Sequence, residues 1–182
     1  MEKLTPPRIG MRTIKTAVAV ALSYLIFVPF GLLYNESYPG VLGYIGPLYA
    51  CIPCVVCMQS SVEQTLQVGV SRFLGVLVGA AIGALMMLIP EAVFNFWLVK
   101  AVMLGLSCIA GILICTNLLH RPAACTMACI LPCVMAISGS VTGSERHLYA
   151  LARVLETIVG VSVAFLINSI LPTHKPPESK PS

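Results

Sequence analysis

The sequence contains no aspartate and few charged residues of either sign. Charged residues make up 10% of the 182 positions and hydrophobic residues 58%, whereas roughly a quarter of an average soluble domain is charged. Mean hydropathy is +0.93. Because one membrane-spanning helix takes about 20 apolar residues, the chain has room for about six or seven spans and for no separate soluble domain. The composition therefore predicts an integral membrane protein.

Groups that carry enzymatic chemistry are also scarce. The histidines His120, His147 and His174 stand singly in expected loops or near the end of the chain, and no GxxxxGK[ST] phosphate-binding loop is present. We therefore expect no enzyme and no cofactor, and any transport has to be driven by an ion gradient or by the gradient of the substrate. The net charge of +4 is spread singly over expected helix ends, so it indicates topology instead of nucleic-acid binding.

Cysteine is plentiful, but its positions argue against a disulfide framework. All eight cysteines fall in apolar segments, and the run CIPCVVC (residues 51–57) raises the question of a soft-metal site. Such a site needs several deprotonated thiolates, which are costly to form in lipid. We therefore expect no metal site, and interpret both cysteine groups as small residues at helix contacts. The cysteines are Cys51, Cys54, Cys57, Cys108, Cys115, Cys125, Cys129 and Cys133.

Apolar runs and turn residues predict an all-α bundle of six transmembrane helices. The six expected helices cover about 11–34, 41–59, 61–90, 93–119, 123–137 and 147–171. Pro29 is expected to kink the far end of the first of them. The transmembrane domain then extends over residues 1–172, and the polar, proline-rich residues 173–182 are expected to be a disordered tail.

The distribution of basic residues predicts the topology. With six spans both chain ends share one side, which holds eight basic residues against three on the other, so we expect a multi-pass protein of the cell membrane with both termini in the cytoplasm. The larger set is Lys3, Arg8, Arg12, Lys15, Arg72, Arg121, Lys175 and Lys180, and the smaller set is Lys100, Arg146 and Arg153.

Two halves of the chain, about 9–90 and 93–172, resemble each other. Residues 50–62 align without gaps on residues 129–141, which pairs Pro53 with Pro132. After an insertion of two residues the match resumes, with Arg72 on Arg153 and Gly79 on Gly160. Each half holds three spans, an odd number, so the second half would cross the membrane in the opposite sense. This 3+3 inverted repeat is typical of secondary transporters, although a duplication without transport is the alternative.

Prolines interrupt the expected second and fifth helices at corresponding places. Pro47 and Pro53 lie in the second helix and Pro132 in the fifth, and a proline in a span removes an amide donor and breaks the helix. Paired breaks of this kind point to a substrate site near the middle of the membrane. Kinks that only shape the packing are the alternative.

A stripe of glycines marks the third expected helix. Gly75, Gly79 and Gly83 recur every four residues, a spacing that lets another backbone approach closely. Gly160 occupies the equivalent place in the sixth helix. We expect this face to pack on another helix, either of the same chain or of a second subunit.

Ionisable side chains within spans are costly and are therefore candidates for a substrate or proton pathway. Arg153 and Glu156 are three residues apart, so they share a helix face and can form a pair that releases and recaptures a proton. Arg12, Lys15 and Arg72 either extend to lipid headgroups or form an electropositive vestibule that gathers anions. The full candidate set is Arg12, Lys15, Arg72, Lys100, Arg153, Glu156 and Asn168.

Four segments of the chain resemble the membrane domain of the aromatic acid exporter, or fusaric acid resistance, family. They are the entry IGMRTIKTAVAVALSYLI, the segment SRFLGVLVGAAIG that begins at Ser71, the segment KAVMLGLSCIAGILICTNLL that begins at Lys100, and RVLETIVGVSVAFLIN, which ends at Asn168. The resemblance implies export of aromatic carboxylates and related weak acids. It assigns motif positions to Arg12, Lys15, Arg72, Gly75, Arg153, Glu156, Thr157, Gly160 and Asn168.

The chain would be a minimal unit of that family. One six-helix bundle encloses little volume, so we expect a homo-oligomer, most simply a symmetric dimer, whose other partners are the lipid bilayer and a small organic anion. The alternative is a membrane scaffold or accessory subunit that recruits a partner through its glycine-rich helix face and transports nothing.

Overall fold

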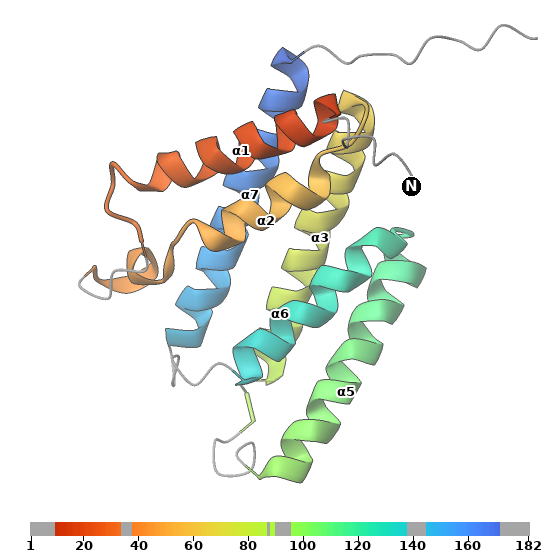
Figure 1. Ribbon diagram of the computed structural model, residues 1–182. Helices are drawn as coiled ribbons and strands as arrows, with labels where there is room; N and C mark the ends of the chain where they lie inside the picture. Colours follow the sequence, from red (N-terminus) through yellow and green to blue (C-terminus); the bar gives the residue numbers. More distant parts are fainter. Residues whose placement is uncertain (1–9, 34–37, 87, 90–95, 138–144, 172–182) are drawn as a thin grey trace, which may run out of the picture.

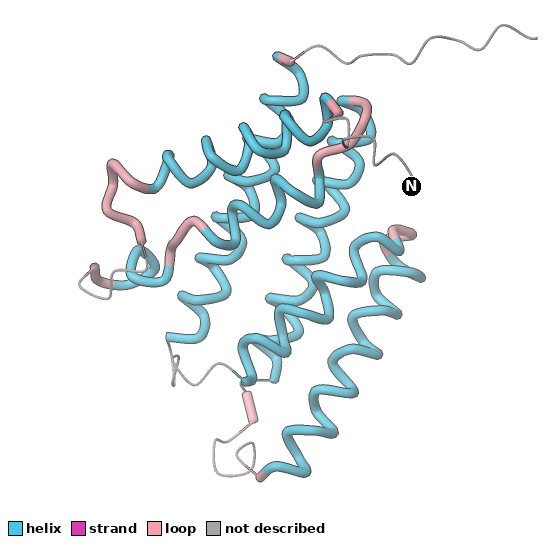
Figure 2. The backbone as a smooth tube through the Cα atoms, viewed as in Figure 1, coloured by secondary structure: helices cyan, strands magenta, loops and turns pink. Residues whose placement is uncertain are grey.

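The computed structural model describes residues 10–33, 38–86, 88–89, 96–137 and 145–171, and the expected tail at 173–182 lies outside them. Within the described residues all regular structure is helical (Figure 2). The described part of the chain contains six α-helices, two short 3-10 turns and one π-helical turn. The elements are α1 (Met11–Phe27), η1 (Gly40–Tyr44), α2 (Leu48–Cys57), α3 (Val62–Met86), α5 (Trp97–Leu113), η2 (Ile114–Leu118), η3 (Pro122–Ala124), α6 (Cys125–Ile137) and α7 (Glu145–Ile170).

The helices fall into a long and a short class. Three segments of the described chain, Val62–Met86, Trp97–Leu118 and His147–Ile170, are long and apolar enough to cross a membrane. At a rise of about 1.5 Å per residue each exceeds the roughly 30 Å of a bilayer core, whereas the 10 residues of α2 and the 13 of α6 fall short of it. The predicted all-α fold is confirmed, and of the six α-helical segments among the described residues three have the full length of a span.

Two predicted helices are shorter because of proline. The first ends at Phe27 instead of continuing to residue 34, two residues before Pro29, so its far end is terminated and not merely kinked. The second begins at Leu48 instead of residue 41, after a 3-10 turn and an irregular linker that ends at Pro47. Proline has no amide donor and disfavours a helical residue before it, which explains both shortened ends.

Helices α3 and α7 form the centre of the packing. They contact each other, and each also packs on a short helix from the other half of the chain, α3 on α6 and α7 on α2. Helix α1 lies beside α2, and α5 lies beside α6 (Figure 1). Lys15 near the start of α1 is bonded to Asn168 near the end of α7, so the two ends of the described chain lie at the same end of the bundle.

Glycine sets how closely these pairs approach. A Cβ atom added at Gly75 would collide with the carbonyl oxygen of Ala124, and one added at Gly160 would collide with that of Ala50. Gly79 lies against the backbone of α6. Because only glycine lacks a side chain, these contacts bring backbones together as in other membrane helix pairs. The glycine stripe of α3 therefore packs on α6 of the same chain.

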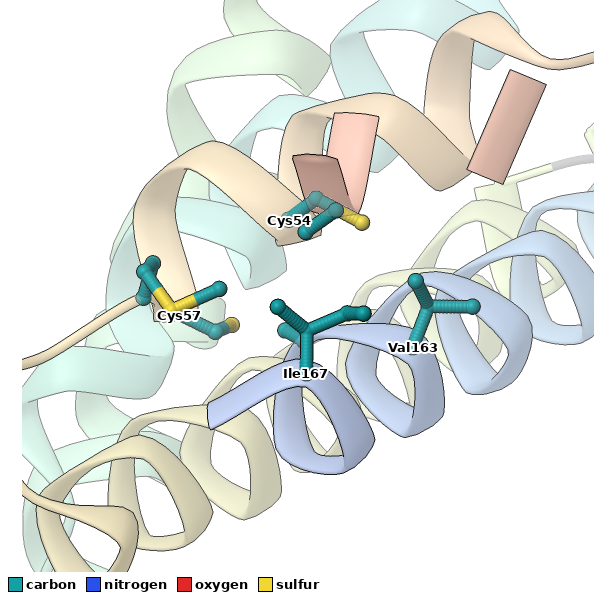
Figure 3. Close-up of a cluster of buried hydrophobic side chains, with 7 residues drawn as sticks. Cys54, Cys57, Val163 and Ile167 are labelled. Carbon is teal, nitrogen blue, oxygen red and sulfur yellow. The ribbon is translucent and has the colours of Figure 1, made fainter. Parts of the chain in front are cut away.

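Thiols take part in the apolar packing between α2 and α7. Cys54 and Cys57 point towards Val163 and Ile167 (Figure 3), and the same buried cluster includes Ala19 of α1. Cys54, Cys57 and Cys115 are buried, the other five cysteines are partly exposed, and all eight, which lie in described segments, are free thiols. The cysteines of α2 thus serve as small, polarisable packing groups.

Candidate functional site

The most prominent charged group is an ion pair on α7. Arg153 and Glu156 are 2% and 1% exposed, and an Nη1 to Oε2 distance of 3.0 Å joins them within one turn of the helix. A buried pair of this kind compensates two charges that would each be very costly alone. The two side chains therefore form one nearly neutral unit inside the bundle.

Aromatic rings surround the arginine of this pair. The Arg153 guanidinium lies 3.8 Å from the ring centre of Tyr49 on α2 and 4.5 Å from that of Tyr149 on α7. The hydroxyls of the two tyrosines are 3.3 Å apart, and the Tyr44 ring meets Tyr149 edge to face. Cation–π contacts add to the stabilisation of a desolvated guanidinium, so α2 and α7 hold Arg153 from two sides.

The same pair fixes the linker that precedes α2. The amide of Gly46 donates a hydrogen bond of 2.6 Å to Glu156 Oε1, and Arg153 Nη2 donates one to the carbonyl oxygen of Tyr44. Pro47 follows directly and caps the start of α2. The irregular backbone thus obtains from α7 the hydrogen bonds that a helix would have supplied, as broken membrane helices require.

A cavity of about 330 Å³ lies between α2, α3, α6 and α7. Arg72 and Arg153 reach it from the two long helices, Tyr49 reaches it from α2, and the remaining wall is mostly apolar. Pro53 contributes to the wall from inside α2. Both α2 and α6 continue through their internal prolines, Pro53 and Pro132, so the helix breaks predicted at these two positions are not present. The other lining residues are Ile52, Val56, Val76, Thr126, Met127, Ile130, Leu131, Val134 and Thr157.

Arg72 differs from Arg153 in what it contacts. It is 8% exposed, and no carboxylate, carbonyl or hydroxyl group among the described residues is hydrogen-bonded to it or paired with it. The neighbouring Ser71 hydroxyl accepts a hydrogen bond from Arg121 and donates one to the carbonyl of Gln67. The cavity therefore contains one arginine that an acidic partner neutralises and one that none of the described groups does.

A second polar cluster lies at the end of the bundle where the described chain begins and ends. Lys15 Nζ donates a hydrogen bond of 2.8 Å to Asn168 Oδ1, and Asn168 Nδ2 donates one of 2.7 Å to Thr65 Oγ1 and another to the carbonyl of Gln59. Lys15, Thr65 and Asn168 are 3%, 0% and 1% exposed. The cluster joins α1, α3 and α7.

The remaining candidates lie outside these two groups. Arg12 is exposed, and its Nε donates a hydrogen bond to the carbonyl of Met58. Lys100 is partly buried on α5. Pro132 is buried inside α6, but it is not among the residues that line the cavity. Of the three predicted vestibule cations, Lys15 joins the Asn168 cluster, Arg12 bonds to the Met58 carbonyl next to Gln59, and Arg72 reaches the cavity.

Several residues of the site were not predicted from the sequence. Tyr49 and Tyr149 are ordinary residues of apolar helices, and Thr65 is one polar position among several in α3. Gly46 takes part only through its backbone amide. A useful signal exists for Tyr49, which lies between Pro47 and Pro53, but no local pattern indicates that it meets Tyr149.

An all-α chain with three apolar span-length helices and buried charged groups is a multi-pass membrane protein. The model of the fusaric acid resistance protein-like family matches residues 30–167, most of the chain, and the protein belongs to that family. Members of this family are membrane proteins associated with transport and efflux and are generally not enzymes. No curated protein and no solved structure matches the chain.

Proposed function

We propose that the protein is a membrane transporter subunit that exports small organic anions, with aromatic carboxylates as the main substrate class. The cavity between α2, α3, α6 and α7 is the observation that carries this proposal. It combines mostly apolar walls with two arginines, Arg72 and Arg153. An aromatic carboxylate needs the same combination, because its ring favours apolar contacts and its charge needs a guanidinium in a site shielded from water.

The size of the cavity supports a small substrate. Its volume of about 330 Å³ is at the lower end of the roughly 300–1,000 Å³ of ligand pockets. A single aromatic ring with a carboxylate fits such a volume, whereas an acid of drug size exceeds it. We therefore expect monocyclic acids to be better substrates than larger ones.

The proposed transport mechanism is alternating access by a 3+3 inverted repeat. The packing is consistent with it, because α3 packs on α6 as α7 packs on α2, and α1 lies beside α2 as α5 lies beside α6. Both short helices, α2 and α6, contain an internal proline, Pro53 and Pro132. Two corresponding short helices with an internal proline, both lining the cavity, support an exchange between two orientations.

Glu156 is our candidate for coupling to protons. The structure describes the surroundings of two acidic side chains, Glu63 and Glu156. Glu63 is exposed and Glu156 is buried. Glu156 holds Arg153 at the cavity and also accepts the Gly46 amide before α2. Protonation of Glu156 would weaken both contacts, so a proton gradient could act through this residue on the linker that precedes α2.

We further propose a cell-membrane homo-oligomer with both termini in the cytoplasm. The excess of basic residues on the side of the chain ends supports this orientation. The scaffold alternative relied on the glycine face of α3. Because α6 of the same chain covers that face, we do not propose a docking function for it.

Transport by the purified protein tests the proposal. Liposomes that contain the protein should release radiolabelled benzoate or cinnamate faster than empty liposomes when a proton gradient or a membrane potential is imposed. Ile130→Trp places a large ring at the cavity wall and should remove most of this release. Ile109→Trp is the matched control, since Ile109 is an exposed α5 residue that does not line the cavity.

If no aromatic carboxylate is released under either gradient, the proposed function is wrong. The same holds if Ile130→Trp and Ile109→Trp release benzoate at the same rate as the unchanged protein, because transport would then bypass the cavity.

A further inference from the structure

We propose that Arg72 is the residue that pairs with the carboxylate of the transported anion, and that Arg153 is a positioning residue that holds α7 to α2. This inference rests on the proposed function and assigns different roles to the two arginines of the cavity. The internal repeat of the sequence aligns Arg72 with Arg153, whereas the surroundings of the two side chains in the structure differ.

The positive charge of Arg153 already has partners. Glu156 lies 3.0 Å from its Nη1, the carbonyl of Tyr44 accepts a hydrogen bond from its Nη2, and the rings of Tyr49 and Tyr149 stack on its guanidinium. These partners belong to η1, α2 and α7. An incoming carboxylate would have to displace Glu156, which would then be left buried without a counter-charge. Arg153 is therefore better suited to joining helices than to binding a substrate.

Arg72 has none of these partners. It is more than nine-tenths buried and reaches the same cavity from α3. The position three residues further on, which holds Glu156 beside Arg153, holds Gly75 beside Arg72, so α3 supplies no acidic side chain there. Among the described residues, no hydrogen-bond or ion-pair partner compensates the charge of Arg72. A buried guanidinium without a counter-charge is costly, and an anion in the cavity removes that cost.

The surroundings of Arg72 also orient the rest of the substrate. Val76, one turn further along α3, is buried and lines the cavity, as do Pro53 of α2 and Leu131 of α6. A carboxylate held by the Arg72 fork leaves its ring against these apolar side chains, while Arg153 of α7 and the Tyr49 ring of α2, which contact each other, line another part of the cavity. The cavity then recognises an acid by one charge-assisted contact and the ring by burial.

Matched acid and amide pairs separate charge recognition from ring recognition. We would measure the binding of benzoate, benzamide, cinnamate and cinnamamide to the full chain in detergent by calorimetry. Arg72→Gln should weaken the binding of the acids by about 10- to 100-fold, the range for loss of one charge-assisted hydrogen-bonded contact, and should leave the amides within about threefold. Unchanged amide binding also shows that the cavity is intact.

The matched control removes the other arginine together with its partner. The double variant Arg153→Gln/Glu156→Gln keeps the net charge of the cavity and should retain the preference for acid over amide. Arg72→Lys keeps the charge but replaces the planar fork by a single ammonium, so it should weaken acid binding by less than Arg72→Gln does. Arg72→Lys therefore keeps the test decisive if Arg72→Gln does not fold.

Two results would overturn the assignment of Arg72. One is a loss of acid preference in the double variant while Arg72→Gln retains it, and the other is unchanged acid binding in both Arg72 variants. A different result affects the proposed function instead. If the unchanged protein binds no acid of the panel, the transport proposal is wrong. The transport proposal is also wrong if the protein binds acids but transports none, but the variants then still decide whether Arg72 binds the carboxylate.

Discussion

A comparison of the two long inner helices turns on the position three residues after a buried arginine. On α7, Arg153 is followed at this distance by Glu156, and on α3, Arg72 is followed by Gly75. Glu156 fills the space with a charge that binds its own arginine and the Gly46 amide. Gly75 leaves the space empty, so the carbonyl of Ala124 approaches α3 closely.

This difference shows how one residue decides the role of a neighbouring charge. Where the acid is present, the guanidinium is compensated inside the protein and the irregular linker before α2 is fixed by α7. Where glycine is present, two backbones pack closely and α3 provides no acidic partner for Arg72, the residue that we propose binds the ligand. A long arginine-containing helix that packs on a short proline-containing helix can thus either hold the two helices together or form a binding surface.

The largest expected effect follows from removing the acid. Glu156→Ala should lower the free energy of unfolding by about 3–5 kcal/mol, because it leaves the buried Arg153 without its counter-charge. The loss of stability is measured by thermal unfolding in detergent, monitored by size-exclusion chromatography. Leu155→Ala, at the neighbouring exposed position, is the control, and an equal loss in both variants would contradict the importance of the ion pair.

The glycine side of the comparison is tested by adding one methyl group. Gly75→Ala should lower the free energy of unfolding by about 1–3 kcal/mol, the usual cost of overpacking, since the new Cβ meets the backbone of Ala124. Gly105 on α5 has no neighbouring atom within 4 Å of an added Cβ, so Gly105→Ala should be neutral or slightly stabilising. Equal destabilisation of both variants would show that close packing of α3 on α6 is unimportant.

The polar cluster at the chain ends should respond more locally. Asn168→Ala removes the partner of Lys15 and of the Thr65 hydroxyl and should cost about 1–3 kcal/mol through unsatisfied buried groups. Its control is Ser169→Ala, whose exposed hydroxyl bonds only to the carbonyl of Phe165 in its own helix. Hydrogen exchange should rise in α1 only in the Asn168 variant, and a similar rise in both would refute the joining role of the cluster.

The smallest expected effect compares two cysteines that the repeat aligns. Cys54 is 0% exposed in the α2–α7 cluster, whereas Cys133 on α6 is partly exposed. Cys54→Ala should therefore cost up to about 1.5 kcal/mol, and Cys133→Ala should cost less. Maleimide labelling of the folded protein should reach Cys133 before Cys54, and the reverse order would contradict the packing of α2 on α7.

Much of the helical framework follows from local signals. Apolar runs located the six helices, and prolines explain the ends that were misplaced, because a hydropathy pattern does not distinguish a helix from the 3-10 turn and linker at residues 40–47. The spacing of Arg153 and Glu156 also predicted that they could pair, and the structure contains this ion pair. Such predictions succeed where the interacting residues lie within one helical turn.

The composition of the site depended on contacts between distant segments. Tyr49 meets Tyr149, Lys15 bonds to Asn168, and the Gly46 amide bonds to Glu156. Each pair is about 100 residues or more apart in the chain, so no local periodicity relates its members.

By itself the sequence determined that lipid surrounds this chain, that it forms helices, and where charge and glycine lie along them, because hydropathy, proline and helical spacing act over a few residues. Only the tertiary structure decided that α3 and α7 bring Arg72 and Arg153 to one cavity and that Glu156 neutralises only the second. Compensation of a buried charge depends on which groups lie within a few ångströms of it, and packing between helices sets those distances.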